Sequence, residues 1–213
     1  MTEQMRNHWW WRPGWRLRRR MYAVHTTFED QDELHDLVRA YQEPLHNLPG
    51  LDIIPLKWLH LTMQGIGFAD EVDDVDAIAQ AVQRRLSPIE AVTLRFDRPL
   101  LDPEAPQFHP HPVDGIDRVR RAVRQGIIDV RGAVGETDVW TPHMSIAYSD
   151  TDGPAKPYRD ALASVTADPV TVTIQRIQLI ALGRDEHLYR WESVADLPLG
   201  TQSLYPPRRM HGR

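Results

Sequence analysis

The stretch that decides the fold is Trp58-Leu59-His60-Leu61-Thr62-Met63, in which polar and apolar side chains alternate. Alternation with a period of two residues is typical of a β-strand whose two faces meet different surroundings. His60 and Thr62 then share one face, and the apolar side chains that flank them share the other. An imidazole and a hydroxyl on the polar face indicate a groove rather than a packed core.

A second stretch repeats this arrangement later in the chain, as Trp140-Thr141-Pro142-His143-Met144-Ser145-Ile146. His143 and Ser145 share a face by the same alternation, and the apolar residues take the opposite one. The two histidines lie 83 residues apart, and so do the two hydroxyl residues. The matched pair predicts a groove lined by two imidazoles and two hydroxyls.

The composition is that of an ordinary soluble globular protein. The 213 residues suffice for one sizeable domain or two small lobes, with 41% hydrophobic and 26% charged residues. The absence of cysteine excludes disulfides, thiolate metal sites and thiol catalysis, and it fits a reducing cytosol, so we expect a cytoplasmic protein. No segment reads as a signal peptide or a membrane span, so no membrane contact is expected. A net charge of −5 argues against broad coating of nucleic acid.

Residues 1–20 differ from the rest of the chain. They hold four of the seven tryptophans and six arginines, and their net charge is +5 against −10 for the remainder. One interpretation is an arm that contacts nucleic acid, with indoles stacking on bases and arginines meeting phosphates. The other is an extended segment that packs its indoles on the domain, which we favour because a large apolar surface rarely stays in water. We treat residues 1–19 as a separate N-terminal segment.

Helical and strand patterns alternate beyond this segment. Apolar residues spaced three and four apart predict helices over 29–46, 70–86, 114–130 and 157–165. Alternation and β-branched residues predict strands over 21–28, 58–63, 91–96, 140–146, 170–182 and 188–194. The proline-rich residues 98–113 fit either a distorted edge strand or a loop.

The order helix, histidine strand, helix, strand occurs twice. We therefore predict an α+β fold over residues 20–200, a single domain made of two similar lobes that each contribute one histidine strand to a shared cleft. Residues 201–213 are predicted to form a C-terminal tail.

Two histidines and two hydroxyls suit phosphodiester cleavage. Imidazole titrates near neutral pH, so one histidine can activate water while the other protonates the leaving sugar oxygen. The hydroxyls of Thr62 and Ser145 can donate hydrogen bonds to phosphoryl oxygens and stabilise the charge of the transition state. This chemistry needs no metal, and the residues alone do not rank the two histidines.

The motifs His60-Leu61-Thr62 and His143-Met144-Ser145, with their flanking residues, resemble the paired motifs of the 2H phosphoesterase superfamily. This superfamily includes the RNA 2′,3′-cyclic phosphodiesterases, also called 2′-5′ RNA ligases. The resemblance covers most of residues 20–200. It implies a bilobal fold with pseudo-two-fold symmetry, in which each lobe is an antiparallel sheet with helices packed outside and a cleft between them. It further implies His60 as the proton donor, His143 as the base, and Thr62 and Ser145 as phosphate-binding residues.

Two features depart from the family pattern. Residues 98–113 should supply a regular strand and do not read as one, and the Trp/Arg-rich start is not part of the general pattern. His25 belongs to a third His-x-Thr sequence on an apparent strand, and we regard it and Tyr148 as candidates for substrate contact. Chance for His25, and a purely packing role for Tyr148, are the alternatives.

No cofactor or metal is expected. The pair His109 and His111 has acidic residues nearby, but no compact set of three or four ligands and no His-Glu-x-x-His pattern is present. We interpret the pair as part of a solvated loop. The chain also lacks a glycine-rich phosphate loop and a nucleotidyl-lysine motif, which argues against ATP-driven ligation.

The sequence supports a metal-independent phosphodiesterase that opens 2′,3′-cyclic phosphates of RNA ends or nucleotides to 2′-phosphates, with reversible 2′-5′ ligation as an associated activity. The alternative is a non-catalytic protein that binds a nucleotide or an RNA end in the same groove. We expect a monomer in either case.

Overall fold

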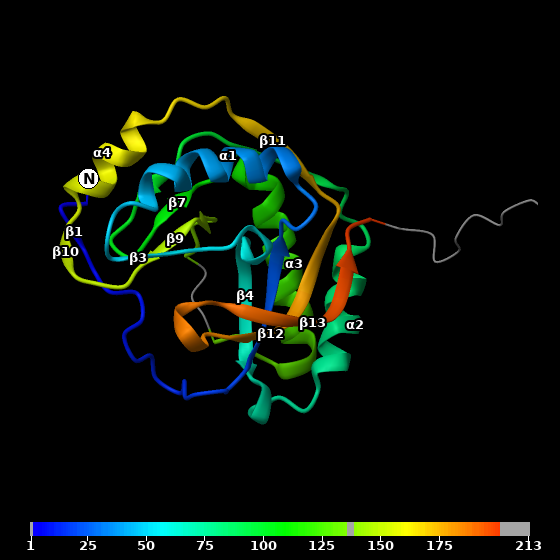
Figure 1. Ribbon diagram of the computed structural model, residues 1–213. Coiled ribbons are helices and arrows are strands. Elements are labelled where there is room, and N and C mark those ends of the chain that lie inside the picture. The colour runs from blue at the N-terminus through cyan, green and yellow to red at the C-terminus, as the bar shows by residue number, and fades with distance from the viewer. Residues whose placement is uncertain (1, 136–138, 201–213) are drawn as a thin grey trace, which may run out of the picture.

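A four-stranded antiparallel sheet in the order β13-β12-β2-β4 forms the first lobe of the computed structural model, which describes residues 2–135 and 139–200 (Figure 1). Its strands are β2 (Met21–Thr27), β4 (His60–Phe68), β12 (Arg176–Gly183) and β13 (Arg190–Pro198). The alternation around His60 is confirmed, because Leu59, Leu61 and Met63 are buried while His60 and Thr62 are partly exposed.

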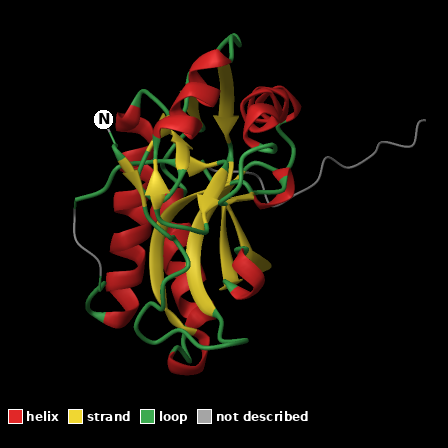
Figure 2. Ribbon diagram, turned by 60° about the vertical axis from the view of Figure 1, so that its left-hand side comes forward, coloured by secondary structure: helices red, strands yellow, loops and turns green. Residues whose placement is uncertain are grey.

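Two long helices, α2 (Val75–Leu86) and α3 (Val113–Arg131), pack against each other and cover the apolar face of this sheet (Figure 2). They approach closely at Gly126, where a Cβ atom would lie 2.6 Å from the Val82 Cα. The buried Arg120 of α3 donates a hydrogen bond from Nε to the Met63 carbonyl, at 3.0 Å. These contacts hold β4, the strand that carries His60, on the apolar face of the sheet, opposite to the face of the His60 side chain.

The second lobe is built from shorter strands. A three-stranded sheet contains β6 (Leu100–Leu101), β7 (Pro106–Phe108) and β8 (Met144–Ser145), and β3 (Leu51–Ile53) pairs with β9 (Ala147–Ser149). Two further pairs are β5 (Val92–Phe96) with β11 (Val170–Ile174) and β1 (Gln4–Met5) with β10 (Gly153–Pro154). The helices α1 (Asp32–Gln42) and α4 (Lys156–Ser164) belong to this lobe, and one continuous apolar core spans both lobes.

Four short 3₁₀ helices join these elements within the described residues, at Glu43–Leu45, Leu56–Trp58, Ala69–Glu71 and Asp185–His187. The predicted helices over 29–46 and 70–86 therefore begin later than expected, and 3₁₀ turns take part of their predicted length. No described helix is both long enough and apolar enough to span a bilayer.

The single strand predicted over 170–182 is wrong. The chain leaves β11 at Gln175 and begins β12 at Arg176, and the two strands belong to different sheets. Gln175 and Arg176 interrupt the apolar pattern at this point, but the change of partner depends on pairing with distant strands, β5 for β11 and both β2 and β13 for β12.

The second histidine strand is also shorter than predicted. His143 precedes β8, and Ile146 forms a bend between β8 and β9, which pair with different strands. The buried Gln42 side chain holds this bend by donating 2.8 Å hydrogen bonds to the carbonyls of Ile54 and Ile146. Residues 98–113 combine both alternatives, since short strands β6 and β7 are separated by loops.

The N-terminal segment is attached along its length. Met5 in β1 is buried, the His8 amide bonds to the Ser149 carbonyl at 2.8 Å, and Arg19 pairs with Asp70 near the start of the first lobe's helices. The segment thus reaches from the second lobe to the first (Figure 1). The predicted tail over 201–213 lies outside the described residues.

Candidate active site

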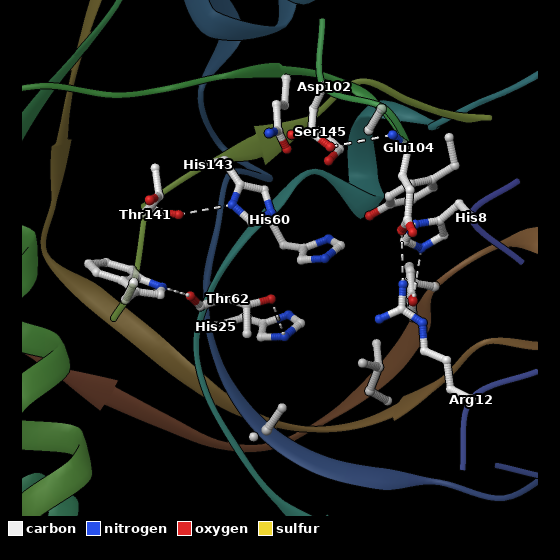
Figure 3. A pocket seen from close by; sticks show the side chains of 18 of the residues that line it. His8, Arg12, His25, His60, Thr62, Asp102, Glu104, Thr141, His143 and Ser145 are labelled. Carbon is white, nitrogen blue, oxygen red and sulfur yellow. Dashed lines mark hydrogen bonds and ion pairs between the residues drawn. The ribbon is translucent and has the colours of Figure 1, made fainter. Parts of the chain in front are cut away.

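The two histidine motifs meet at a cavity of about 730 Å³ between the lobes (Figure 3). His60, Thr62, His143 and Ser145 all line it, so the structure brings together the four residues that the sequence pattern paired. The first two come from β4 of the large sheet, and the second pair comes from β8 and the residue before it.

The two imidazoles are held by equivalent hydrogen bonds. His60 Nδ1 lies 2.8 Å from the Trp58 carbonyl, and His143 Nδ1 lies 3.0 Å from the Thr141 carbonyl. A carbonyl only accepts, so each Nδ1 carries the proton. Each Nε2 is then the ring atom that can take or give a proton in the cavity.

Thr62 and Ser145 lie beside different buried groups. Thr62 Oγ1 is 3.2 Å from His25 Nε2, while Ser145 is a neighbour of the buried Tyr148 phenol. The indole of Trp140 ties the two motifs together, because its Nε1 donates to the Thr62 carbonyl at 3.1 Å. This hydrogen bond links the second motif directly to the strand that carries the first.

His25 lines the cavity floor but is only 1% exposed. Its ring stacks on His60, with centroids 4.6 Å apart and planes 4° apart, and its Nδ1 is buried without a hydrogen-bond partner. Residues 25 and 62 are directly paired across β2 and β4, which explains the contact. His25 therefore has a place in the site, beneath the two motif residues of β4.

Tyr148 also reaches the cavity, although alternation from Ser145 places it on the other face. The bend at Ile146 resets the alternation between β8 and β9, so the phenol turns to the same side. It is buried and stacks on His8, with centroids 4.1 Å apart. Tyr148 therefore forms part of the buried cavity wall.

Burial keeps several of these groups neutral. It lowers the pKa of His60 to about 4, opposed by the hydrogen bond to Trp58 and reinforced by His143. Burial, with His60 as the second cause, lowers the pKa of His25 well below its ordinary value. Burial likewise raises the pKa of Tyr148, and the nearby Tyr189 adds to this effect.

A group of cavity residues beside β9 escaped prediction from the sequence. His8 Nδ1 lies 2.9 Å from Glu104 Oε2, His8 Nε2 lies 3.0 Å from the Tyr189 hydroxyl, and Arg12 donates to Glu104 at 3.2 Å. Burial, followed by the charges of Arg12 and Arg184, lowers the pKa of His8 to about 3. No pattern near residue 8 signals this role, because its partners lie some 96 and 181 residues away.

His109 is expected in a solvated loop, but it also lines the cavity, with its ring centroid 6.4 Å from that of His143. His111 instead faces away and pairs with Asp97. Among residues 2–135 and 139–200, no three histidine, aspartate or glutamate side chains are grouped so that they could hold a metal ion.

Comparison with known proteins now identifies the family. A family model described as the 2′-5′ RNA ligase superfamily matches residues 28–186, well over half of the chain. The chain belongs to the 2′-5′ RNA ligase superfamily. The predicted resemblance to the 2H phosphoesterases is thereby confirmed, together with the α+β fold.

Solved structures show the same superfamily fold. TT0787 of Thermus thermophilus aligns with a TM-score of 0.63 at 17% identity, covering 86% of this chain and 100% of that one. E. coli LigT in complex with NADP+ aligns with a TM-score of 0.61 at 16% identity, covering 86% and 99%. The MHV ns2 PDE domain aligns with a TM-score of 0.50 at 13% identity, covering 73% and 99%. No curated protein matches the sequence.

The match to the 2′-5′ RNA ligase superfamily begins at residue 28, whereas His8 and Arg12 precede it. Part of the cavity wall therefore comes from a segment outside the family match. In this superfamily member, the N-terminal segment and the motif strands together enclose the site.

Proposed function

We propose that this protein is a metal-independent phosphodiesterase that opens 2′,3′-cyclic phosphates of RNA ends or nucleotides to 2′-phosphates. The observation that carries the proposal is the equivalent placement of two imidazoles. Each donates Nδ1–H to the carbonyl two residues earlier, and both rings line one cavity with a hydroxyl beside them. Such a pair can supply the acid and the base that opposite sides of a phosphodiester require.

The reaction balances with water as the only co-reactant. His143 takes a proton from water through Nε2 while the water oxygen bonds to phosphorus. The bond from phosphorus to the ribose 3′ oxygen breaks, and His60 gives its Nε2 proton to that oxygen. The product is a 2′-phosphate, and attack by a ribose hydroxyl on the cyclic phosphate in place of water is the corresponding ligation.

The assignment of His60 as the acid and His143 as the base comes from the family resemblance, and the low pKa of His60 at first argues against it. A proton donor must be charged, yet burial lowers the pKa of His60 to about 4. A bound phosphodiester is an anion, and a negative charge close to an imidazole favours its protonated form. We propose that substrate binding raises the pKa of His60 enough to make it the acid.

Thr62 and Ser145 are proposed to bind the phosphate. The ring of His25 supports this role for Thr62, because a neutral imidazole that donates from Nε2 to Oγ1 leaves the hydroxyl proton free to point at a phosphoryl oxygen. His25 is thus proposed as a positioning residue. Tyr148 is proposed to orient Ser145 rather than to reach the substrate, given its burial.

Nucleotide binding by relatives supports the substrate class. E. coli LigT has been crystallised with 3′-AMP, ATP, NADP+ and phosphate. A cavity of about 730 Å³ falls in the range of small-molecule sites. We accordingly propose nucleotides or RNA ends as ligands, and a monomeric protein.

The deciding experiment is hydrolysis of a nucleoside 2′,3′-cyclic phosphate with EDTA present. We expect turnover by the wild type and a loss of about 10²–10⁴-fold in kcat for His60→Ala and for His143→Ala. The matched control is His46→Ala, since His46 is exposed and does not line the cavity. Binding without turnover at any pH would instead support the non-catalytic alternative, because two-histidine catalysis requires a bell-shaped pH profile.

A further inference from the structure

The N-terminal segment leaves its most exposed indoles next to the candidate active site. Trp10 is 51% exposed and Trp11 is 71% exposed, whereas Trp9 and Trp15 of the same segment are partly buried. Trp9 donates from Nε1 to Asp52 at 2.8 Å, and Trp15 packs edge-on against Phe68. The packing interpretation of the segment thus holds for two indoles and fails for the other two.

This exposure occurs within an ordered segment rather than at a loose end. β1 anchors the chain on one side of Trp10 and Trp11, and Arg19 pairs with Asp70 and Glu71 on the other. The Trp9 amide bonds to Asn7 Oδ1 at 2.6 Å, which holds the turn that presents the two indoles. Two large apolar rings are therefore kept in water by the surrounding structure, at a cost that a bound ligand would offset.

The exposed indoles are continuous with the cavity. Arg12 lines the cavity, and its guanidinium lies 5.3 Å from the ring centroid of Trp10. Trp15 lines both the cavity and a second hollow of about 200 Å³, whose wall includes Trp10 and Trp11. A ligand whose phosphate sits between the two histidines can therefore extend past Arg12 onto these indoles.

The charges around the indoles indicate which part of a ligand they would meet. Arg12 pairs with Glu104 and Arg16 pairs with Asp70, while Arg184 of the second hollow donates to the His8 carbonyl and lies over the Trp9 ring. The side chains of Trp10 and Trp11 carry no charge, so their faces suit an uncharged part of a ligand. Indole faces bind bases of any identity by stacking, which needs no charge.

We propose that Trp10 and Trp11 form a stacking platform for the bases that precede the terminal cyclic phosphate of single-stranded RNA. The inference rests on the proposed function and narrows it, because it makes RNA ends of several nucleotides better substrates than mononucleotides. The segment outside the family match then determines substrate length, while the two motifs perform the chemistry.

The test compares kcat/KM for a tetranucleotide with a 2′,3′-cyclic phosphate end and for a nucleoside 2′,3′-cyclic phosphate. The wild type should prefer the tetranucleotide, and the double variant W10A/W11A should lose about 5- to 100-fold on it, mainly in KM, with little change on the mononucleotide. Trp10→Phe with Trp11→Phe should retain part of the preference, because a phenyl ring still stacks. Leu100→Ala is the matched control, since Leu100 is 60% exposed and apolar but lines neither the cavity nor the second hollow.

Salt separates stacking from charge attraction. Because W10A/W11A removes two uncharged rings and leaves every arginine in place, the ratio between wild type and W10A/W11A on the tetranucleotide should stay nearly constant from about 50 to 200 mM salt, unlike the loss caused by removing a phosphate contact. Equal wild-type efficiency on the two substrates, or equal losses on both in W10A/W11A, would overturn the platform.

RNA binding by Trp10 and Trp11 can also be tested independently of whether the protein hydrolyses cyclic phosphates. Fluorescence anisotropy of a labelled tetranucleotide with a 2′-phosphate end should show weaker binding to W10A/W11A than to wild type, even if neither hydrolyses a cyclic phosphate. That result would uphold the platform while the proposed reaction fails. Equal RNA binding by W10A/W11A and wild type would overturn the proposal. If the variant instead lost binding to anionic lipid vesicles, or lost self-association, the indoles would be assigned to a membrane surface or to contact with a second copy.

Discussion

The two histidine motifs have the same sequence pattern but stand in different surroundings. His60 begins the nine-residue β4, which pairs with β2 along its length, and its ring lies against His25 and 5.3 Å from the Trp191 centroid. His143 precedes the two-residue β8, is exposed, and has the His109 ring as its aromatic neighbour, with centroids 6.4 Å apart. The two rings thus make the same kind of hydrogen bond through Nδ1, but the His143 ring is more exposed to solvent than the His60 ring.

This difference teaches that a repeated motif specifies the direction of an imidazole but not its protonation. The bond from Nδ1 to the carbonyl two residues earlier is local and recurs in both motifs. The low pKa of His60, about 4, comes chiefly from burial by other parts of the chain. Two similar motifs can therefore supply one half-buried and one exposed proton-transfer group.

The largest expected effect separates the roles of the two histidines. A p-nitrophenyl phosphodiester has a leaving group that needs no protonation, so His60→Ala should recover most of its roughly 10²–10⁴-fold loss on this substrate, whereas His143→Ala should not. Steady-state kinetics on the cyclic phosphate and on the activated ester measure this. Recovery of His143→Ala instead of His60→Ala would reverse the assigned roles.

The next effect compares the two hydroxyls. Thr62→Val and Ser145→Ala each remove one donor to the phosphoryl oxygens, and we expect losses of about 10- to 10³-fold in kcat. Thr62→Ser keeps the hydroxyl and should retain most of the activity. Full activity in Thr62→Val would remove this residue from the proposed phosphate site.

A smaller effect is expected beneath the first motif, at His25. His25→Phe keeps a ring on His60 but loses the contact with Thr62 Oγ1, so kcat should fall by about 5- to 50-fold. In a Thr62→Val background, His25→Phe should lower kcat little further, because the hydroxyl that His25 orients is already absent. An additive loss in the double variant would indicate a structural role only.

The smallest effect concerns stability in acid. His8 and His60 have folded-state pKa values near 3 and 4, below the unfolded value of 6.5. The unfolded chain binds more protons between these values, so stability present above pH 6.5 is lost as the pH falls towards 4. His60→Phe should reduce the drop in Tm over this range by roughly 5 °C. Thermal unfolding followed by circular dichroism at several pH values between neutral and the folded-state pKa of His60 measures this drop, and an unchanged drop in the variant would contradict the prediction.

Local patterns in the sequence predicted the parts of the site that depend on local geometry. Alternation in a strand placed His60 with Thr62 and brought His143 and Ser145 to the same groove, and helical spacing located α2, α3 and α4 approximately. The break at Gln175 and the bend at Ile146 escaped prediction, because the strand with which each segment pairs lies far away in the sequence.

The amino-acid sequence by itself determined the paired motifs, the family and the direction in which each imidazole is held, since these follow from side chains within a few residues of each other. Only the tertiary structure decided that His8 and Arg12 share the cavity, that His25 lies beneath Thr62, and that Trp10 and Trp11 stay in water. Burial and long-range contacts set these features, and both arise from residues far apart in the chain.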